Sequence, residues 1–497
     1  MREVLYIQAG EISNYTGTHF WNTQETYLND GEDGDSEESI IDPNISFCET
    51  ADAQGIVSLY PRVLVIDRNS KFGRLRSSQT CEGDTSAVLW NGKVVEHRQE
   101  PIQPSRYQTL VEEASEQTAK HPARSPAEID VRYWSDFGRP SYLPRSLQRI
   151  PDSSVWGNGS VNWNDGPEFF SRYNEEFELM DSAVRLLIED CDNIQGIQVL
   201  NDASTFGSYM GSFFVSFRDE YLKLPSLSFP LGVGGISKSL DIENAESTRK
   251  FLNEALYLSA LNELSSMNIP INDPASWRGP RGWPTKSKYH QSAILSTHIE
   301  TVTLPLRLRN APEDISSACR QLKWRTSTPF GELSGVFPVS SISDLDGAVH
   351  NFSIDTPGQS STVYTRWDVT RGLSPRQIGA YEEWIEKKRT ATGPYTKSTH
   401  SFAYPLPSSF PPLTSEEDQY LLSSSNPIST QVLSTLSTSS NTANLLEGYA
   451  LFVEKCLKTR TSVVISAGTS FDDLKELANN LWTMHDNSSG LEELGDI

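Results

Sequence analysis

The chain has 497 residues, of which 37% are hydrophobic and 10% aromatic, so it is long enough to bury the cores of two or three domains. Asp and Glu total 65 against 42 Lys and Arg, and the formal net charge of -23 disfavours direct binding to nucleic acid or anionic lipid. Five widely spaced cysteines without a C-x-x-C pair fit neither a zinc site nor a disulfide framework, and they favour a reducing compartment.

Neither a metal site nor a transmembrane segment is predicted. The eight histidines include no H-E-x-x-H motif, and no apolar run approaches the roughly 18 residues that a membrane span needs. The N-terminal sequence lacks the apolar region of a secretory signal. We therefore expect a protein on the cytosolic side, whose membrane contact is peripheral or made through a partner.

The first predicted elements are a strand over residues 4–7, a turn at Gly10 and a helix that begins near Ser13 and Asn14. Nucleotide-binding folds use this arrangement to present the backbone N–H groups of a helix N-terminus to phosphate. The first motif of the chain therefore suggests a nucleotide site.

The next stretches predict a loop, a strand and a surface excursion. Residues 29–39 are acidic and glycine-rich, as expected of a solvated loop. The run RVLVID at 62–67 predicts a buried parallel strand whose carboxyl end, at Asp67, faces a crevice. Residues 115–130 are polar and contain proline, which favours a surface excursion.

A second strand–helix unit follows. Apolar residues at three- and four-residue spacing predict a helix over 168–191, and GIQVL at 196–200 predicts a strand. A loop at 201–209 with one glycine, Gly207, then leads into another helix. Two such units favour a doubly wound α/β domain with a ligand crevice at the strand ends.

The remaining predictions concern the second half of the chain. Residues 392–442 are rich in Ser, Thr and Pro, which is typical of a long loop or linker. Ser470 and Asp473 form a capping-box pair at the start of the last helix. The other expectations are a helix at 249–266, an insertion at 268–288, a helix turning β-like at 294–309, strands near 333–342 and 362–370, and helices at 443–458 and 470–484.

The loop at 201–209, NDASTFGSY, is a poor phosphate cradle. A cradle needs bare backbone so that several N–H groups can approach the phosphate oxygens, and this loop has one glycine. The hydroxyls of Ser204, Thr205 and Ser208 could still contact phosphate, whereas Phe206 requires apolar cover.

A metal-assisted hydrolase would need acids at the crevice, and two residues are candidates for this role. Asp67 and Asp202 each end a predicted strand, but Asp202 is more simply interpreted as the cap of the helix that follows it. Glu11 would repel phosphate if it faced the crevice, and its interaction with its own helix dipole explains it equally well. No local pattern predicts nucleophilic catalysis.

Several motifs, spread over about the first 310 residues, resemble those of tubulins. MREVLYIQAGEISNYTGTHFW is similar to the tubulin N-terminus, and YPRVLVIDRNS is similar to the second nucleotide loop. DNIQGIQVLNDASTFGSYMGSFFVSFRDEY resembles the tubulin phosphate-loop stretch. LNEALY at 252–257 resembles D-N-E-A-L-Y, which implies that Asn253 occupies a guanine-contacting position.

The departures from tubulin fall on the residues that handle the nucleotide. Glu11 and Ile12 replace Gln and Cys of the first loop, and Asn69 stands at the position of the metal-associated Glu. Residues 203–206 (ASTF) replace the glycine triplet and threonine. The stretch that resembles the hydrolysis element of a neighbouring subunit contains Glu300 without an N-x-D signature, and the second guanine-contacting Asn falls at Ser292 or Gln291.

This combination resembles the Misato family of tubulin-like proteins. The resemblance implies a role in partitioning and inheritance of mitochondria and mitochondrial DNA, and in mitochondrial distribution and morphology. It also implies protein partners at the mitochondrial outer surface, in the cytoskeleton or among chaperonin components, and a location at the cytosolic face of mitochondria and in the cytoplasm.

The resemblance implies a domain plan. We expect a tubulin-like nucleotide-binding-type domain at 1–266, with an acidic loop insertion at 29–57 and the polar excursion at 115–130. We further expect an insertion, a core helix and an α+β second domain at 267–391, a loop or linker at 392–442, and C-terminal helices with an acidic tail at 443–497.

The hypothesis that we favour is a non-enzymatic tubulin-like protein with a degenerate GTP pocket. A guanine-nucleotide-binding switch with weak or no hydrolysis is the alternative, and a polymerising cytoskeletal subunit is the second alternative. No catalytic residue and no metal ligand is assigned, and GTP or GDP is a possible ligand. The residues predicted for the degenerate pocket are Gly10, Glu11, Asn14, Asp67, Asp202, Ser204, Thr205, Gly207, Ser208 and Asn253.

Overall fold

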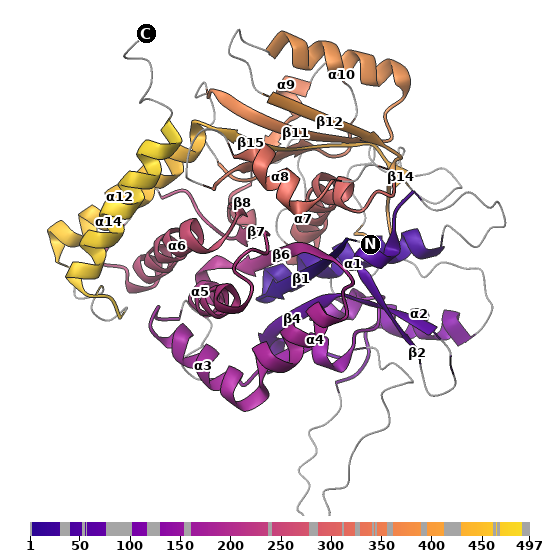
Figure 1. Ribbon diagram of the computed structural model, residues 1–497, viewed down its shortest axis with the longest axis horizontal. Coiled ribbons are helices and arrows are strands. Elements are labelled where there is room, and N and C mark those ends of the chain that lie inside the picture. The colour runs from indigo at the N-terminus through magenta and orange to yellow at the C-terminus, as the bar shows by residue number, and fades with distance from the viewer. Residues whose placement is uncertain are drawn as a thin grey trace, which may run out of the picture.

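The structure is a computed structural model (Figure 1). It describes residues 2–29, 40–51, 55, 57–75, 102–116, 130–153, 161–236, 241–277, 287–310, 313–323, 329–339, 342, 345–354, 361–388, 395–411, 429–460, 464 and 468–489. Four predictions lie wholly or mostly outside these residues: the acidic loop at 29–39, the excursion at 115–130, the second half of the insertion at 268–288 and the acidic tail.

A parallel sheet forms the first layer, as predicted for a doubly wound domain. Its order is β5-β4-β1-β6-β7-β8, and every neighbouring pair is parallel. The strands are β1 (Glu3–Ala9), β4 (Val63–Arg68), β5 (Leu147–Ile150), β6 (Ile194–Asp202), β7 (Ser226–Leu231) and β8 (Met267–Asn268). The carboxyl ends of all six therefore meet at one edge of the sheet.

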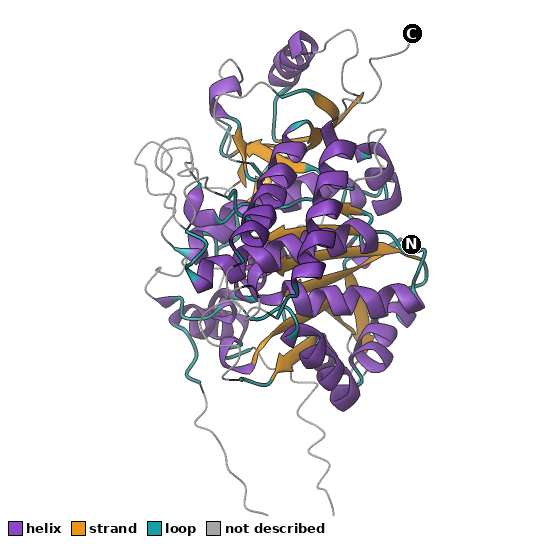
Figure 2. Cartoon of the chain, turned by 90° about the vertical axis from the view of Figure 1, so that its left-hand side faces the viewer, coloured by secondary structure: helices purple, strands orange, loops and turns teal. Residues whose placement is uncertain are grey.

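Helices cover both faces of this sheet (Figure 2). Alternate residues of β1 enter two separate cores: Leu5, Ile7 and Ala9 pack into one, and Val4 and Tyr6 pack into the other. The helices are α1 (Glu11–Asn29), α2 (Arg106–Glu116), α3 (Asp165–Phe177), α4 (Arg185–Glu189), α5 (Ala203–Glu220) and α6 (Ala245–Leu264). Strands buried on both faces explain why β1 and β4 have continuous apolar sequences.

Two local predictions in this layer were wrong. The helix expected at 168–191 is interrupted at Glu178, whose backbone is left-handed (φ 51°), and continues as a π-helix (Leu179–Val184) and α4. Asn174 accepts a hydrogen bond from the N–H of Met180 across this break. The loop expected at 201–209 does not exist, because β6 runs to Asp202 and α5 begins at Ala203.

A second sheet has the order β10-β9-β15-β11-β12. Its strands are β9 (Glu332–Val336), β10 (His350–Asn351), β11 (Val363–Arg371), β12 (Tyr395–Ser401) and β15 (Val432–Ser439). The pair β11–β12 is parallel and is joined through α10 (Pro375–Lys388), while the other pairs are antiparallel. Small elements complete the region: α8 (Ile315–Leu322), α9 (Leu345–Ala348), β13 (Tyr404–Pro405) and β14 (Ser429–Thr430).

Two further predictions need correction here. Residues 392–442 are not simply a linker, since β12 and β15 lie within them and β15 is in the interior of the second sheet. The stretch at 294–309 does not turn into a strand. It continues α7 (Lys288–Thr303), whose residues 289–303 are all buried between the two sheets, and ends in a short 3₁₀ turn (Leu304–Leu306).

The C-terminal helices are α12 (Asn441–Thr459) and α14 (Phe471–Ser489), which confirms the two helices predicted there. They lie together beside α6 (Figure 1). The capping box is also confirmed, because the N–H of Asp473 donates to Ser470 Oγ (3.1 Å) and the N–H of Ser470 donates to Asp473 Oδ2 (3.0 Å). Tyr449 of α12 donates a hydrogen bond to the buried carboxyl of Glu254 on α6.

Candidate functional site

A cavity of about 200 Å³ lies at the carboxyl edge of the parallel sheet. This is where the doubly wound fold places its ligands. Ligand pockets usually measure roughly 300–1,000 Å³, so the cavity is small for a nucleotide. Its lining comes from the ends of β4, β6 and β7 and from α1, α5, α6 and α7: Glu11, Ile12, Asp67, Arg68, Val161, Asp202, Ser204, Thr205, Phe206, Leu231, Gly232, Lys250, Asp273 and Lys288.

The N-terminus of α1 is already occupied by a carboxylate of the chain itself. Asp202 Oδ2 accepts the N–H of Ile12 (3.0 Å), and Oδ1 accepts both the N–H (2.9 Å) and the hydroxyl (2.7 Å) of Ser13. Gly10 makes this contact possible: its φ is +106°, and a Cβ there would lie 2.6 Å from Asp202 Cγ. Asp202 thus takes the place that a phosphate would occupy.

The prediction that Asp202 caps the helix that follows it was wrong. Its side chain caps α1, and it makes no capping hydrogen bond to α5, the helix that follows it. Burial raises the pKa of Asp202 to about 6, although the hydrogen bonds from Ser13 and Ile12 lower it, so the group is ionised at neutral pH. The first turn of α5 faces the cavity with Ser204 and Thr205 and receives no capping hydrogen bond from Asp202, its N-cap residue.

The cations of the cavity are paired with its acids. Lys288 Nζ lies 3.0 Å and Lys71 Nζ 3.3 Å from Glu11 Oε2, and Lys250 lies 3.3 Å from Asp273. Burial acts to raise the pKa of Glu11, but the two ammonium groups outweigh it and the pKa is lowered. Glu11 therefore faces the cavity as a carboxylate, and a phosphate would have to displace these ion pairs.

Asp67 lies at the carboxyl end of β4 beside the same edge. It accepts hydrogen bonds from Asn14 Nδ2 (2.9 Å) and from the N–H of Arg68 (2.8 Å). Burial raises its pKa to about 7; the hydrogen bonds oppose this shift and the neighbouring Asp202 and Glu11 charges add to it. A triphosphate would meet three carboxyl groups here, so the site does not fit one.

Five of the ten predicted residues do not line the cavity: Gly10, described above, and Asn14, Gly207, Ser208 and Asn253. Asn253 is buried and its amide donates to the carbonyls of Val161 (2.6 Å) and Ser204 (3.4 Å), so the guanine-contacting position is used for internal contacts. Its Oδ1 is buried and has no hydrogen-bond partner among the residues that the structure describes. Gly207 faces Tyr257, and Ser208 packs against Gly166 of α3. Asn14 Nδ2 donates to Asp67 and to the carbonyl of Ile66.

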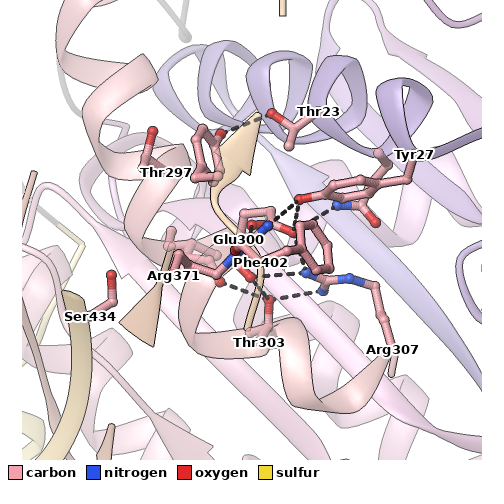
Figure 3. Close-up of polar contacts among 12 residues, drawn as sticks. Thr23, Tyr27, Thr297, Glu300, Thr303, Arg307, Arg371, Phe402 and Ser434 are labelled. Atoms are coloured by element: carbon pink, nitrogen blue, oxygen red, sulfur yellow. Dashed lines mark hydrogen bonds and ion pairs between the residues drawn. The ribbon is translucent and has the colours of Figure 1, made fainter. Parts of the chain in front are cut away.

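Glu300 is not available to a neighbouring subunit. It lies on α7 with no exposed surface, and Figure 3 shows it between Arg307 and Arg371. Oε1 accepts from Arg307 (2.9 Å), Tyr27 (3.0 Å) and Gln24 (3.2 Å), and Oε2 accepts from Arg371 (2.8 Å). The other positions considered on this helix, Gln291 and Ser292, are buried as well.

Sequence reasoning missed the basic residues of the cavity: Arg68, Lys250 and Lys288. One signal was present, because Lys250 lies two residues before the LNEALY stretch and one helical turn before Asn253, and so shares the face of Asn253. Lys288 follows an insertion and carries no such signal. Among the described residues, no group of three or more His, Cys, Asp and Glu could hold a metal ion.

The architecture and the edge cavity define a tubulin-like α/β protein. Comparison with known proteins agrees: residues 2–113 match the model of the Misato Segment II tubulin-like domain, and residues 123–308 match the Tubulin domain. The chain belongs to the Misato family of tubulin-like proteins, and the fungal relatives that it matches are named DML1 or dml1.

The chain matches its relatives over different shares of their length. The chain is 34% identical to Protein DML1 of Gibberella zeae over 62% of this chain and 61% of that protein. It is 30% identical to Protein dml1 of Aspergillus clavatus over 76% and 77%, respectively, and 29% identical to Protein dml1 of Aspergillus niger over 90% and 92%. No helix in the described ranges has the length and apolar character needed to cross a bilayer.

Proposed function

We propose that this chain is a non-enzymatic, tubulin-like protein that acts in the partitioning and inheritance of mitochondria and mitochondrial DNA, and in mitochondrial distribution and morphology. Family membership supports the process. The absence of catalysis is supported by one observation above all: the Asp202 carboxylate binds the N–H groups of Ile12 and Ser13, where phosphate would otherwise bind. We further propose that it works through protein partners at the cytosolic face of mitochondria.

Equilibrium binding of GTP and GDP tests the non-enzymatic part. Titration calorimetry of the purified chain, with and without Mg²⁺, is expected to detect no binding up to about 1 mM nucleotide, which corresponds to a binding free energy weaker than roughly -4 kcal/mol. A micromolar dissociation constant would contradict this and would favour the nucleotide switch.

Complementation tests the mitochondrial part. In an Aspergillus niger strain depleted of its own dml1 protein, expression of this chain is expected to restore the distribution of mitochondria and of stained mitochondrial DNA. A matched strain expressing Aspergillus niger dml1 sets the upper limit and the empty vector sets the lower one. If the chain is expressed and the mitochondria behave as in the vector strain, the proposed process is wrong.

A guanine-nucleotide-binding switch is the second candidate. It is favoured by the first turn of α5, which faces the cavity and is not capped by the Asp202 side chain, and by Lys250 and Lys288 in the lining. A helix N-terminus with nearby cations can hold phosphate without a glycine triplet. Binding at α5 alone would leave the contact between Asp202 and α1 in place.

A further inference from the structure

An exposed apolar surface surrounds the hairpin of β2 (Phe47–Ala51) and β3 (Val57–Pro61), away from the edge cavity. Of the nine large hydrophobic side chains that are exposed in the described residues, Val57 (58% exposed) and Leu59 (37%) share one face of β3, and Ile40 (54%) directly precedes Ile41, which lines the same hollow as Leu59. Clustered exposed apolar residues on a soluble protein commonly mark an interaction surface. We call this surface, formed by Ile40, Val57, Leu59 and the hollow beside them, the hairpin patch.

The patch includes a hollow that could receive a side chain. The cavity measures about 190 Å³ and is walled by Tyr27 and Leu28 of α1, by Ile41 and by Phe47 and Leu59 of the hairpin. Its base is rigid, because Tyr27 donates a hydrogen bond to the buried Glu300. A preformed apolar hollow next to exposed aliphatic side chains is the usual seat of an interface anchor residue.

The acidic residues at the hairpin patch favour a basic partner. Leu59 pairs directly with the exposed Glu49 across the hairpin, and Asp42 and Arg309 both line the hollow. The ten residues that precede Ile40 in the sequence contain six acids and no base, and the whole chain carries a net charge of -23. A second copy of this chain would be repelled by this charge, whereas a basic segment would be attracted and oriented by it.

We propose that the hairpin patch docks a basic, amphipathic segment of a partner protein, with an apolar side chain of that segment in the hollow. The segment's apolar face covers Val57 and Leu59, and its basic residues lie toward Glu49 and Asp42. This interaction is independent of the edge cavity and of whether nucleotide binds there.

The probe is a fluorescein-labelled, 18-residue peptide of Leu and Lys with helical spacing, and binding is measured by fluorescence anisotropy on the full chain. The wild type is expected to bind this peptide and not the matched Leu/Glu peptide. The double variant Val57→Ser/Leu59→Ser is expected to bind about tenfold more weakly, since two aliphatic contacts are lost. Glu49→Lys is expected to weaken binding about threefold at low salt, and less at high salt.

Leu222→Ser is the matched control, because Leu222 is 75% exposed and lies just beyond α5. It is expected to bind the Leu/Lys peptide as the wild type does. All variants alter exposed side chains, so unchanged thermal midpoints show that they fold. Absence of wild-type binding, or equal loss in Leu222→Ser, would overturn the proposal. Sedimentation that shows a dimer dissociated by Val57→Ser/Leu59→Ser would assign the patch to a second copy instead.

Discussion

Replacement of Arg371 with methionine is expected to lower the free energy of unfolding by about 3 to 5 kcal/mol, the usual cost of breaking a buried ion pair. Arg371 and Glu300 have no exposed surface, and Arg371 also donates to Tyr27 and to the carbonyl of Phe402. Methionine fills much of the space but leaves Glu300 Oε2, Tyr27 and that carbonyl without their donor. Urea unfolding followed by fluorescence measures the loss.

The exposed pair of Arg172 and Glu168 supplies the control for this variant. Arg172→Met removes a cation from a pair on the surface of α3, so its midpoint in urea should match the wild type. A loss below about 1 kcal/mol for Arg371→Met would contradict the assigned role of the network.

The pH dependence of this variant has a defined sign. Burial acts to raise the pKa of Glu300, but Arg371 and Arg307 outweigh it, so the folded pKa lies below the ordinary value of 4.5. The folded state then binds fewer protons than the unfolded chain. The stability contributed by the network is therefore present at neutral pH and is lost as the pH falls below about 4.5, so the difference between wild type and Arg371→Met should shrink there.

Replacement of Asp202 with alanine is expected to turn the edge cavity into an anion site. The N–H groups of Ile12 and Ser13 lose their carboxylate, one negative charge leaves the cavity, and the space beside Gly10 becomes available. About 50 mM inorganic phosphate should then raise the thermal midpoint of the variant by several degrees and leave the wild type unchanged. With a dissociation constant of about 1 mM, this concentration stabilises the folded state by roughly 2 kcal/mol.

Asp202→Asn separates the effects of charge and space in this experiment. The amide removes the charge but still fills the position against α1, so phosphate should stabilise it far less than Asp202→Ala. An equal response of the wild type and Asp202→Ala to phosphate would mean that Asp202 does not block the site. The observation that we use to support a non-enzymatic protein would then be invalid.

The strands and most helices of the first layer could be predicted from the sequence, since their periodicity is local. RVLVID became β4 and GIQVL became β6 because both are apolar runs buried on two faces. The composition of β15 led to a wrong prediction. Its sequence, VLSTLSTS, is rich in Ser and Thr and was predicted as part of a loop or linker, yet all eight residues are buried. Hydrogen bonds make this burial possible: the Ser434 hydroxyl is bonded to His298 of α7, and the Thr435 hydroxyl donates to Asp368 of β11.

The location of the site could be predicted from the sequence, but the contacts among its residues could not. The strand ends located Glu11, Asp67 and Asp202 correctly at one edge, because parallel strands bring their carboxyl ends together. The cap could not be assigned, since Asp202 and Ile12 are 190 positions apart and local rules connect an acid only to the helix that follows it. The partners of Glu300 were hidden for the same reason.

The position of β15 determines when this protein can fold. It is the last strand in the chain order of the described elements, yet it lies between β9 and β11 and joins them into one sheet. The ribosome must therefore synthesise the chain as far as β15 before the second sheet can form. Until then, the edges of β9 and β11 that pair with β15 remain unpaired. High contact order of this kind slows folding, so the strand edges of the second sheet stay exposed to aggregation until residue 439 has emerged.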